Sequence, residues 1–506
     1  MERPSESSLS LHVVWFKRDL RIRDHAPLAN ALSAASADGG SVLLLHAFEP
    51  TDLCHSTTSN RHIRFRWQAW KSLEQEVQQL GWPVTCAAVD SNILECFKWL
   101  NARFSVRRIY SHEETGLKHT YDRDLAVKVW CKAQLIVWQE SPQQAVGRGR
   151  SSRKGWATHW HDSMNKALIR TISLTEMSPL TKLSIDWPSG FVSIFCPKAL
   201  HDQDPGMVGP FQMGGERDAH RYMQSFFEDR VRGYRRQIGQ PQASRQSCSR
   251  LSPYLAWGCI SMRQVFQVFL HAQVPRAKMD LKAFGSRLRW QGHFIQKFES
   301  EDRMEFESVN RGYLDMDHRG TPESLEAWKL GRTGVPLVDA CMRCVVATGY
   351  LNFRMRAMLV SFLTHHLDHP WQAGVAHLAR CFLDFEPGIH YSQFQMQAGV
   401  TGINTIRIYN PVKQGLERDP DGAFIVKWVP ELQCAPTPYR HAPWTMPPME
   451  RAWQDQVWEY IDPIVNIDAA ARMARERLWA RKNSPQVRKE AHRILSVHVA
   501  PESPMD

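Results

Sequence analysis

The apolar residues of this chain follow one period in the first third and another in the rest. In the first third, His12–Phe16, Ser41–Ala47 and Leu135–Trp138 are short apolar runs, typical of strands buried in a parallel sheet. Between them, Arg61–Leu80 repeats its apolar residues at helical spacing. Strands that alternate with helices predict an α/β unit with a doubly wound parallel sheet.

Beyond about Glu216 the strand patterns disappear and long helical stretches dominate. We therefore predict an α/β + all-α fold, with an α/β domain over residues 10–140 and a large all-helical domain over residues 219–500. Pro188–Gly215 is rich in Pro and Gly, which indicates a long connection, and the inter-domain linker is placed at residues 141–218. A chain of 506 residues has room for these two cores.

Charge and motif content narrow the possible ligands. The formal net charge of +11 and the pI near 9.1 favour a polyanionic partner such as nucleic acid, although many basic enzymes have none. No Gly-x-Gly-x-x-Gly follows the first predicted strand, so the sheet is not expected to hold a dinucleotide in the Rossmann manner.

Cysteine usage indicates a reducing compartment. The eleven Cys are scattered without a repeated spacing, which argues against a disulfide framework and predicts a cytoplasmic protein. The one Cys-x-x-Cys, Cys341 and Cys344, lies in an apolar helical run and predicts buried thiols rather than a metal site. No apolar run reaches the length of a membrane span, so no membrane partner is expected.

Two polar stretches of the helical part suit nucleotide chemistry. Cys248–Pro253 brings hydroxyls, backbone amides and one Arg to the start of a helix, which suits a pyrophosphate, although an ordinary helix start is the simpler explanation. Farther on, Arg287, Trp290 and Phe294 share one helical face. That face suits stacking on an extruded nucleobase, or simply a place in the core.

Two further stretches combine charge with apolar surroundings. Arg354 and Arg356 follow an apolar helix, where they would either meet a buried anion or remain solvated at the helix end. Asp384–Pro411 packs acids, one His and several amide side chains among Gly, Pro and large apolar residues. This composition favours a polar ligand over a solvated loop.

These four stretches, in this order, resemble the FAD-binding core of the photolyase/cryptochrome family. The resemblance extends to VVWFKRDLRIRDHAPL at Val13–Leu28, SHEETG at Ser111–Gly116 and NPVKQ…WVPEL at Asn410–Leu432. It covers roughly residues 11–495, and several motifs in matching order make it specific.

The resemblance implies an FAD folded into a U within the helical domain. The residues implied to hold its phosphate region are Tyr234, Cys248, Ser249, Arg250, Leu251 and Ser252. Arg356 would pair with Asp384 near the flavin ring, and Glu386 would join Asp384 beside the flavin and ribose. His390 stands where the family usually has an Asn facing flavin N5. Because His can titrate near neutral pH, we add the hypothesis that flavin redox and pH are coupled.

The substrate positions depart from the family pattern. Arg287 stands where members that repair cyclobutane pyrimidine dimers carry Glu. Phe353 stands where those members carry Asn, and where members acting on the (6-4) lesion carry His. Trp290 matches the Trp on which the extruded base stacks.

The electron-transfer positions also depart from the pattern. The family's chain of three Trp falls on Phe394, Trp371 and His318, from flavin to surface, so only the middle member is intact. Tyr391, Trp328 or another Trp could supply a detour.

The resemblance favours a light-driven DNA repair enzyme, in which excited reduced FAD donates an electron to a pyrimidine dimer flipped out of DNA. The main alternative is a cryptochrome-type blue-light photoreceptor without repair activity, and a third hypothesis is a light-independent flavin or nucleotide-binding protein. The expected partner is DNA with a pyrimidine photoproduct, and the protein is expected to be a monomer.

The N-terminal domain would be an antenna domain, in which Glu113 and Glu114 occupy the matching motif. The resemblance implies a possible antenna chromophore there, of the pterin or deazaflavin type. The iron–sulfur branch of the family needs four clustered Cys near the C-terminal end. No Cys follows Cys434, so that branch is excluded and no metal is expected.

Overall fold

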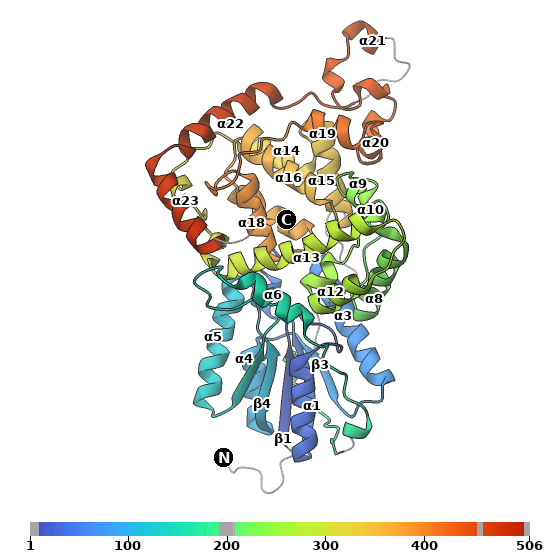
Figure 1. Ribbon diagram of the computed structural model, residues 1–506, viewed down its shortest axis with the longest axis vertical. Helices are drawn as coiled ribbons and strands as arrows, with labels where there is room; N and C mark the ends of the chain where they lie inside the picture. Colours follow the sequence, from blue (N-terminus) through green and yellow to red (C-terminus); the bar gives the residue numbers. More distant parts are fainter. Residues whose placement is uncertain (1–9, 178, 192–205, 207, 453–458, 500–506) are drawn as a thin grey trace.

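A five-stranded parallel sheet forms the core of the N-terminal part of the chain (Figure 1). The computed structural model describes residues 10–177, 179–191, 206, 208–452 and 459–499. The strands are β1 (Ser10–Phe16), β2 (Ser41–Ala47), β3 (Thr85–Val89), β4 (Ser105–His112) and β5 (Val137–Ser141). Their order is β3-β2-β1-β4-β5, and all neighbours are parallel. The connection changes direction between β1 and β4, which leaves a crevice at the carboxyl edge.

Helices cover both faces of this sheet, as a doubly wound fold requires. They are α1 (Ala26–Asp38), α2 (Pro50–Leu53), α3 (Asn60–Gln79), α4 (Ile93–Arg103) and α5 (Lys118–Ala133). Val14 and Phe16 of β1 pack in one cluster with α1 and α3, whereas Val13 and Trp15 pack in another with α4 and α5. The predicted α/β fold is confirmed, and α3 matches the helix expected over Arg61–Leu80 to within one residue at each end.

The strand predictions succeed where the strand is buried on both faces. β2 has the predicted bounds, and all seven of its residues are buried. The buried strand predicted at Leu135–Trp138 is wrong, because Leu135 is 92% exposed with a left-handed φ of 57° and the strand begins at Val137 on the sheet edge. β4 was not predicted, since Arg107 and Arg108 interrupt its apolar residues.

The rest of the described chain is helical, and no strand occurs there after Ser141, which confirms the all-α part. The helices are α6 (Trp156–Asn165), α8 (Glu216–Ser225), α9 (Tyr234–Gln237), α10 (Ser244–Ser247), α11 (Ser252–Ala256), α12 (Met262–His271), α13 (Lys278–Glu299), α14 (Pro322–Leu330), α15 (Pro336–Thr348), α16 (Phe353–Ser361), α17 (Gln372–Cys381), α18 (Pro387–Gln397), α19 (Pro411–Arg418), α20 (Ala423–Trp428), α21 (Pro448–Ala452), α22 (Ile467–Lys482) and α23 (Pro485–His498). Within the described ranges, no helix combines the length and apolarity needed to cross a bilayer.

Among the described residues of the expected linker, the longest regular element is α6. It crosses between the two domains in Figure 1, and its Trp156 and Trp160 are buried. Part of the Pro188–Gly215 prediction, residues 192–205 and 207, lies outside the described residues, as do residues 453–458 and 500 of the predicted helical domain.

Cys341 and Cys344 lie inside α15 and are fully buried, as predicted. Burial raises the pKa of both thiols, so both stay protonated at neutral pH.

Two arginines of the α/β domain join it to the helical domain. Arg18, just after β1, donates to the carbonyls of Ala256 (2.9 Å) and Phe385 (2.7 Å). Arg61, at the start of α3, donates to the carbonyls of Val345 (3.1 Å) and Cys381 (2.6 Å). The last carbonyls of a helix have no partner within it. Arg61 supplies donors at the ends of α15 and α17, where it also donates to the carbonyl of Val346 at 3.0 Å.

Glu299 at the end of α13 makes the stability of the protein depend on pH. Burial raises the pKa of Glu299 from its usual 4.5 to about 7, although Arg148 opposes the shift. The carboxyl is therefore protonated in the folded state and ionised in the unfolded state between pH 4.5 and 7. In that window the folded state binds more protons, so the free energy of unfolding falls as pH rises.

Glu299→Gln should remove this dependence because an amide does not titrate. We expect the wild type to lose on the order of 1–3 kcal/mol between pH 4.5 and 7.5 from this group, and the variant to be more stable than the wild type at pH 7.5. Urea unfolding at both pH values measures the difference. Equal pH slopes for the two proteins would contradict the assignment.

Candidate flavin site

A pocket opens within the helical domain between α16, α18 and the loop that precedes α18. Its lining residues are Phe353, Arg356, Ala357, Val360, Phe382, Asp384, Phe385, Glu386, Ile389, His390, Gln393, Phe394 and Gln397. Five of the residues expected at the flavin therefore line one cavity: Arg356, Asp384, Glu386, His390 and Phe394. Phe353, expected to face the substrate, also lines it and is 49% exposed.

Arg356 and Asp384 form an ion pair at the base of this pocket. Arg356 Nη2 lies 3.0 Å from Asp384 Oδ2, and its Nε donates to the carbonyl of Leu351 at 2.7 Å. The guanidinium also stacks 4.0 Å from the ring centre of Phe382. Burial opposes ionisation of Asp384, but the Arg356 charge and a hydrogen bond from Ser252 outweigh it and lower the pKa of Asp384. The carboxylate is thus ionised at neutral pH.

Two buried carboxylate oxygens in the pocket have no partner among the described residues: Asp384 Oδ1 and Glu386 Oε1. Glu386 precedes α18, and Arg18 lies 3.4 Å from its other oxygen. Burial raises the pKa of Glu386. Buried acceptors without donors are costly, so a ligand with N–H or O–H groups fits here.

The segment Cys248–Ser252 lies next to Asp384, because Ser252 hydrogen-bonds to the Asp384 carboxylate. Arg250 has a left-handed φ of 60°, and its guanidinium stacks 3.7 Å from the centre of the Tyr350 ring. Its Nη2 donates to Gln212 Oε1 at 2.8 Å, while its buried Nε has no partner among the described residues. This unused donor suits an anionic ligand group.

The other members of the expected phosphate set are placed as follows. Leu251 is buried, Ser252 is exposed at the start of α11, and Ser249 Oγ accepts from the Leu251 amide at 3.4 Å. Burial raises the pKa of Cys248 to about 11, so it is a neutral thiol. Tyr234 is buried and its ring packs at right angles to Phe284.

His390 is a neutral hydrogen-bonding group in this structure. Burial lowers the pKa of His390 to about 4. Its Nε2 lies 2.9 Å from the carbonyl of Val375, which can only accept, so Nε2 carries the proton and Nδ1 is an acceptor. The hypothesis that His390 titrates near neutral pH is therefore wrong. Its free acceptor suits a ligand N–H group.

The aromatic contacts leading from the pocket run through Tyr391. Phe394 and His390 lie with ring centres 5.0 Å apart, and Tyr391 packs edge-on against Trp371 at 6.2 Å. Among the described residues, no ring contact joins Trp371 to Phe394 or to His318. His318 instead pairs with Asp368 at 3.3 Å on the surface. The ring contacts therefore favour Tyr391 as the alternative electron-transfer residue between the pocket and Trp371. Trp328 contacts His377 instead.

The three expected DNA-facing residues are exposed. Trp290 is 39% exposed on α13 and packs against Phe294 with ring centres 5.4 Å apart. One turn along, the backbone of Phe294 and Ile295 abuts Gly388, where an added Cβ would lie 2.6 Å from Ile295 Cα. Trp290 therefore lies on α13 about one turn before the point where that helix packs closely on α18. Arg287 is exposed and makes no ion pair with a described residue.

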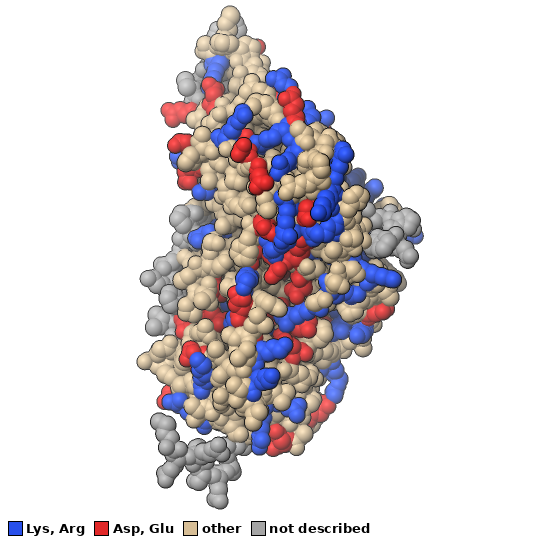
Figure 2. All heavy atoms as spheres, turned by 90° about the vertical axis from the view of Figure 1, so that its left-hand side faces the viewer, with Lys and Arg blue, Asp and Glu red and all other residues tan. Residues whose placement is uncertain are grey.

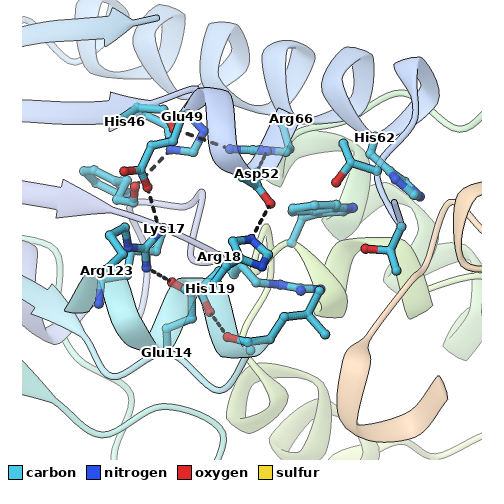
Figure 3. A pocket seen from close by; sticks show the side chains of 18 of the residues that line it. Lys17, Arg18, His46, Glu49, Asp52, His62, Arg66, Glu114, His119 and Arg123 are labelled. Carbon is cyan, nitrogen blue, oxygen red and sulfur yellow. Dashed lines mark hydrogen bonds and ion pairs between the residues drawn. The ribbon is translucent and has the colours of Figure 1, made fainter. Parts of the chain in front are cut away.

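A second cavity lies at the carboxyl edge of the sheet, where it meets the helical domain (Figure 3). Its charged residues pair with one another: Asp52 with Arg66 at 2.5 Å, and Arg123 with both Glu49 at 2.8 Å and Glu114 at 2.5 Å. Glu114 lines this cavity, whereas Glu113 does not, and the antenna site stays a prediction.

Family comparisons agree with this architecture. Residues 284–480 match a family model described as the FAD binding domain of DNA photolyase, and residues 12–151 match one described as DNA photolyase. A deoxyribodipyrimidine photo-lyase of Alkalihalophilus pseudofirmus is 25% identical over 461 residues, covering 87% of this chain and 91% of that protein. The helical part is thus an FAD-binding domain. The chain belongs to the photolyase/cryptochrome family.

Solved structures share the fold along nearly the whole chain. A class III photolyase from Agrobacterium tumefaciens superposes with a TM-score of 0.80 at 22% identity, covering 95% of this chain and 99% of that one. A cryptochrome from Synechocystis sp. PCC6803 gives a TM-score of 0.79 at 21% identity, covering 93% and 100%. A Sulfolobus tokodaii photolyase, described as having two FAD molecules, gives 0.73 at 22% identity, covering 93% and 99%.

Asp384→Ala should cost the protein its FAD. Removing one partner of a buried ion pair leaves the other charge unpaired, which typically costs about 3–5 kcal/mol. We expect a colourless or unstable protein, measured by flavin absorbance per chain and by thermal unfolding. Asp218→Ala, which breaks the surface pair with Arg221, is the matched control and should stay yellow. An Asp384→Ala protein with stoichiometric FAD would refute the assignment.

The Tyr391–Trp371 contact predicts how the oxidised protein is photoreduced. Trp371→Phe and Tyr391→Phe should each slow photoreduction by an external donor, because each removes an oxidisable ring from the path. Trp479→Phe, an exposed Trp on α22, should leave the rate unchanged. Bleaching of the flavin band under blue light gives the rates. Unchanged rates in both core variants would show that electrons take another route.

Proposed function

We propose that this protein is a light-driven DNA repair enzyme that acts on a pyrimidine dimer flipped out of DNA. The observation that carries the proposal is a pair of exposed rings: Phe353, which lines the candidate flavin pocket, and Trp290, on the helix that packs against α18. Exposed aromatic side chains next to a cavity are the surface on which extruded bases stack. The named photo-lyases among the relatives support the same activity.

FAD, when bound, would supply the light absorption and the one-electron donation that splitting a dimer requires. Asp384 and Glu386 would accept hydrogen bonds from it, His390 Nδ1 would accept one more, and Arg250 would face an anionic group. Arg356 would hold Asp384 ionised and in place. The apolar rings of Phe353, Phe382 and Phe394 would exclude water from the pocket.

DNA would be held mainly through its phosphates. Between residues 467 and 498, which form α22 and α23, there are eight Lys or Arg and only three Asp or Glu. Figure 2 shows the side of the molecule on which these helices lie, with Lys and Arg spread over the helical part. Such charge supplies binding without sequence preference, and this binding weakens with salt.

A cryptochrome-type photoreceptor is the second candidate. Arg287 and Phe353 replace the acid and the amide expected of a dimer-repairing member, which favours a protein that keeps FAD but does not split dimers. The cryptochrome among the structural neighbours shares the fold of both candidates. We further propose that the protein works as a monomer in the cytoplasm, in keeping with its scattered free thiols.

Repair can be tested by illuminating the reduced protein with a dimer-containing oligonucleotide and following the recovery of thymine absorbance. Trp290→Ala should lose about 1–3 kcal/mol of binding to damaged DNA, because a stacked base loses its platform. Binding to undamaged DNA should remain sensitive to salt. A wild type that neither prefers nor repairs the lesion would move the conclusion to the photoreceptor.

Arg287→Ala tests whether Arg287, which stands where dimer-repairing members carry Glu, contacts a DNA phosphate. If Arg287 contacts a phosphate, the variant should lose roughly 1.5–3 kcal/mol on all DNA and show a shallower salt dependence. Arg235→Ala, another exposed Arg of the helical domain, is the matched control. Titrations at two salt concentrations distinguish the variants. An unchanged salt slope in Arg287→Ala would exclude the phosphate contact.

A further inference from the structure

A third cavity, of about 280 Å³, lies between the α/β domain, α6 and the start of α12. It shares no lining residue with the flavin pocket or with the cavity of Figure 3. Its floor comes from the loops after β1 and β5 and from the last residue of β4, and the sheet changes direction between β1 and β4. In open α/β sheets, ligands bind in the crevice at this point. The volume is near the lower end for small-ligand sites, roughly 300 Å³.

His112, the last residue of β4, offers this cavity a free acceptor. Its Nδ1 lies 2.7 Å from Asp19 Oδ2, and burial lowers the pKa of His112 to about 3, so the ring is neutral. The pKa of Asp19 is lowered as well, because hydrogen bonds from His112 and His25 outweigh the effect of burial. The carboxylate can only accept, so the proton of His112 is on Nδ1. Its Nε2 is then a bare acceptor without a partner among the described residues.

Gln144 offers a second free acceptor to the same cavity. Its Nε2 donates to the carbonyl of Leu255 at 3.2 Å, while its buried Oε1 has no partner among the described residues. The backbone here is also constrained, because Asp24, Gln144 and Ala145 line the cavity with left-handed φ values of 52°, 54° and 55°. Such non-glycine conformations cost energy and persist where the surroundings impose them.

The remaining lining divides into an apolar wall and a cationic part. Ile169, Ile260 and Met262 supply flat apolar surface. Three lining residues are cationic, Arg21, Lys166 and Arg263, and the one acidic lining residue, Asp24, is already paired with Arg263. The cavity therefore combines unpaired acceptors with apolar contact and a net positive charge.

We propose that this cavity is a second ligand site, and that it binds a nucleoside monophosphate. The N–H groups of the base would donate to His112 Nε2 and to Gln144 Oε1, and the second of these is otherwise buried without a donor among the described residues. The ring would pack against Ile260 and Met262, and the phosphate would lie toward Lys166 and Arg263. The site is separate from the flavin pocket and does not depend on DNA repair being the activity.

A metal ion is the competing occupant. One ligand atom each from Asp19, His25 and His112 lies within 4.8 Å of the others. We favour hydrogen bonds, because both His nitrogens that face Asp19 are its donors, at 2.9 and 2.7 Å. In addition, the charge of Asp19 acts on the pKa of the buried Arg21, so a positive charge already lies near Asp19.

Calorimetric titration of the full, FAD-loaded chain with AMP, GMP, CMP and UMP separately tests the proposal. We expect saturable one-site binding of at least one of them, with an unchanged flavin spectrum, since the flavin pocket remains filled. His112→Phe and Gln144→Leu should each weaken that binding roughly tenfold, because each removes one acceptor. His271→Phe, at the exposed end of α12, is the matched control.

Ser163→Trp keeps the test decisive if His112→Phe does not fold. Ser163 lines the cavity from α6 and makes no side-chain hydrogen bond with a described residue, so a Trp there would fill the space and leave the Asp19–His112 contact intact. It should abolish nucleotide binding while FAD content and melting temperature stay at wild-type values. Binding that survives Ser163→Trp, or four nucleotides that all fail to bind, would overturn the proposal. So would a stoichiometric metal ion that is lost in His25→Ala.

Discussion

The arrangement of the two domains depends on the hydrogen bonds that Arg18 makes across their boundary. Arg18 follows β1 directly, donates to the carbonyls of Ala256 and Phe385, and lies 4.7 Å from the ring centre of Trp257. A buried guanidinium is tolerated only when its donors are satisfied. Its hydrogen bonds therefore fix where the end of β1 meets the helical domain.

The same contact shapes the flavin pocket. Phe385 and Glu386 form the segment that leads into α18, and Arg18 holds the carbonyl of the first and pairs with the carboxylate of the second. Gly258 lies against Arg18 from the helical side, where an added Cβ would fall 2.1 Å from the Arg18 carbonyl oxygen. The backbones of the two domains thus touch directly. The pocket is positioned by the sheet edge as well as by its own helices.

The sequence predicted those features that depend on local pattern or on motif order. The apolar run of β2 and the helical period of α3 gave correct elements, and the resemblance paired Arg356 with Asp384 across 28 residues. Features set by distant neighbours were not predictable. The neutral state of His390 depends on its burial by distant segments, and its tautomer depends on a carbonyl from α17. The contact between Tyr391 and Trp371 depends on how the start of α17 packs against α18. The spacing of apolar residues along one sequence does not reveal such contacts.

Three buried histidines do not make this protein sensitive to pH near neutrality. Burial lowers the pKa of His46 to about 3, and those of His112 and His390 to about 3 and about 4. Each is neutral at physiological pH and donates a hydrogen bond to one carbonyl or carboxylate oxygen. A group that does not change charge cannot couple pH to structure. Two neighbouring buried groups on α13 do have pKa values near neutrality: burial raises the pKa of Glu299 to about 7 and lowers that of Lys297 to about 8. The end of α13 is therefore a place where a change of pH can change the charge of the folded protein.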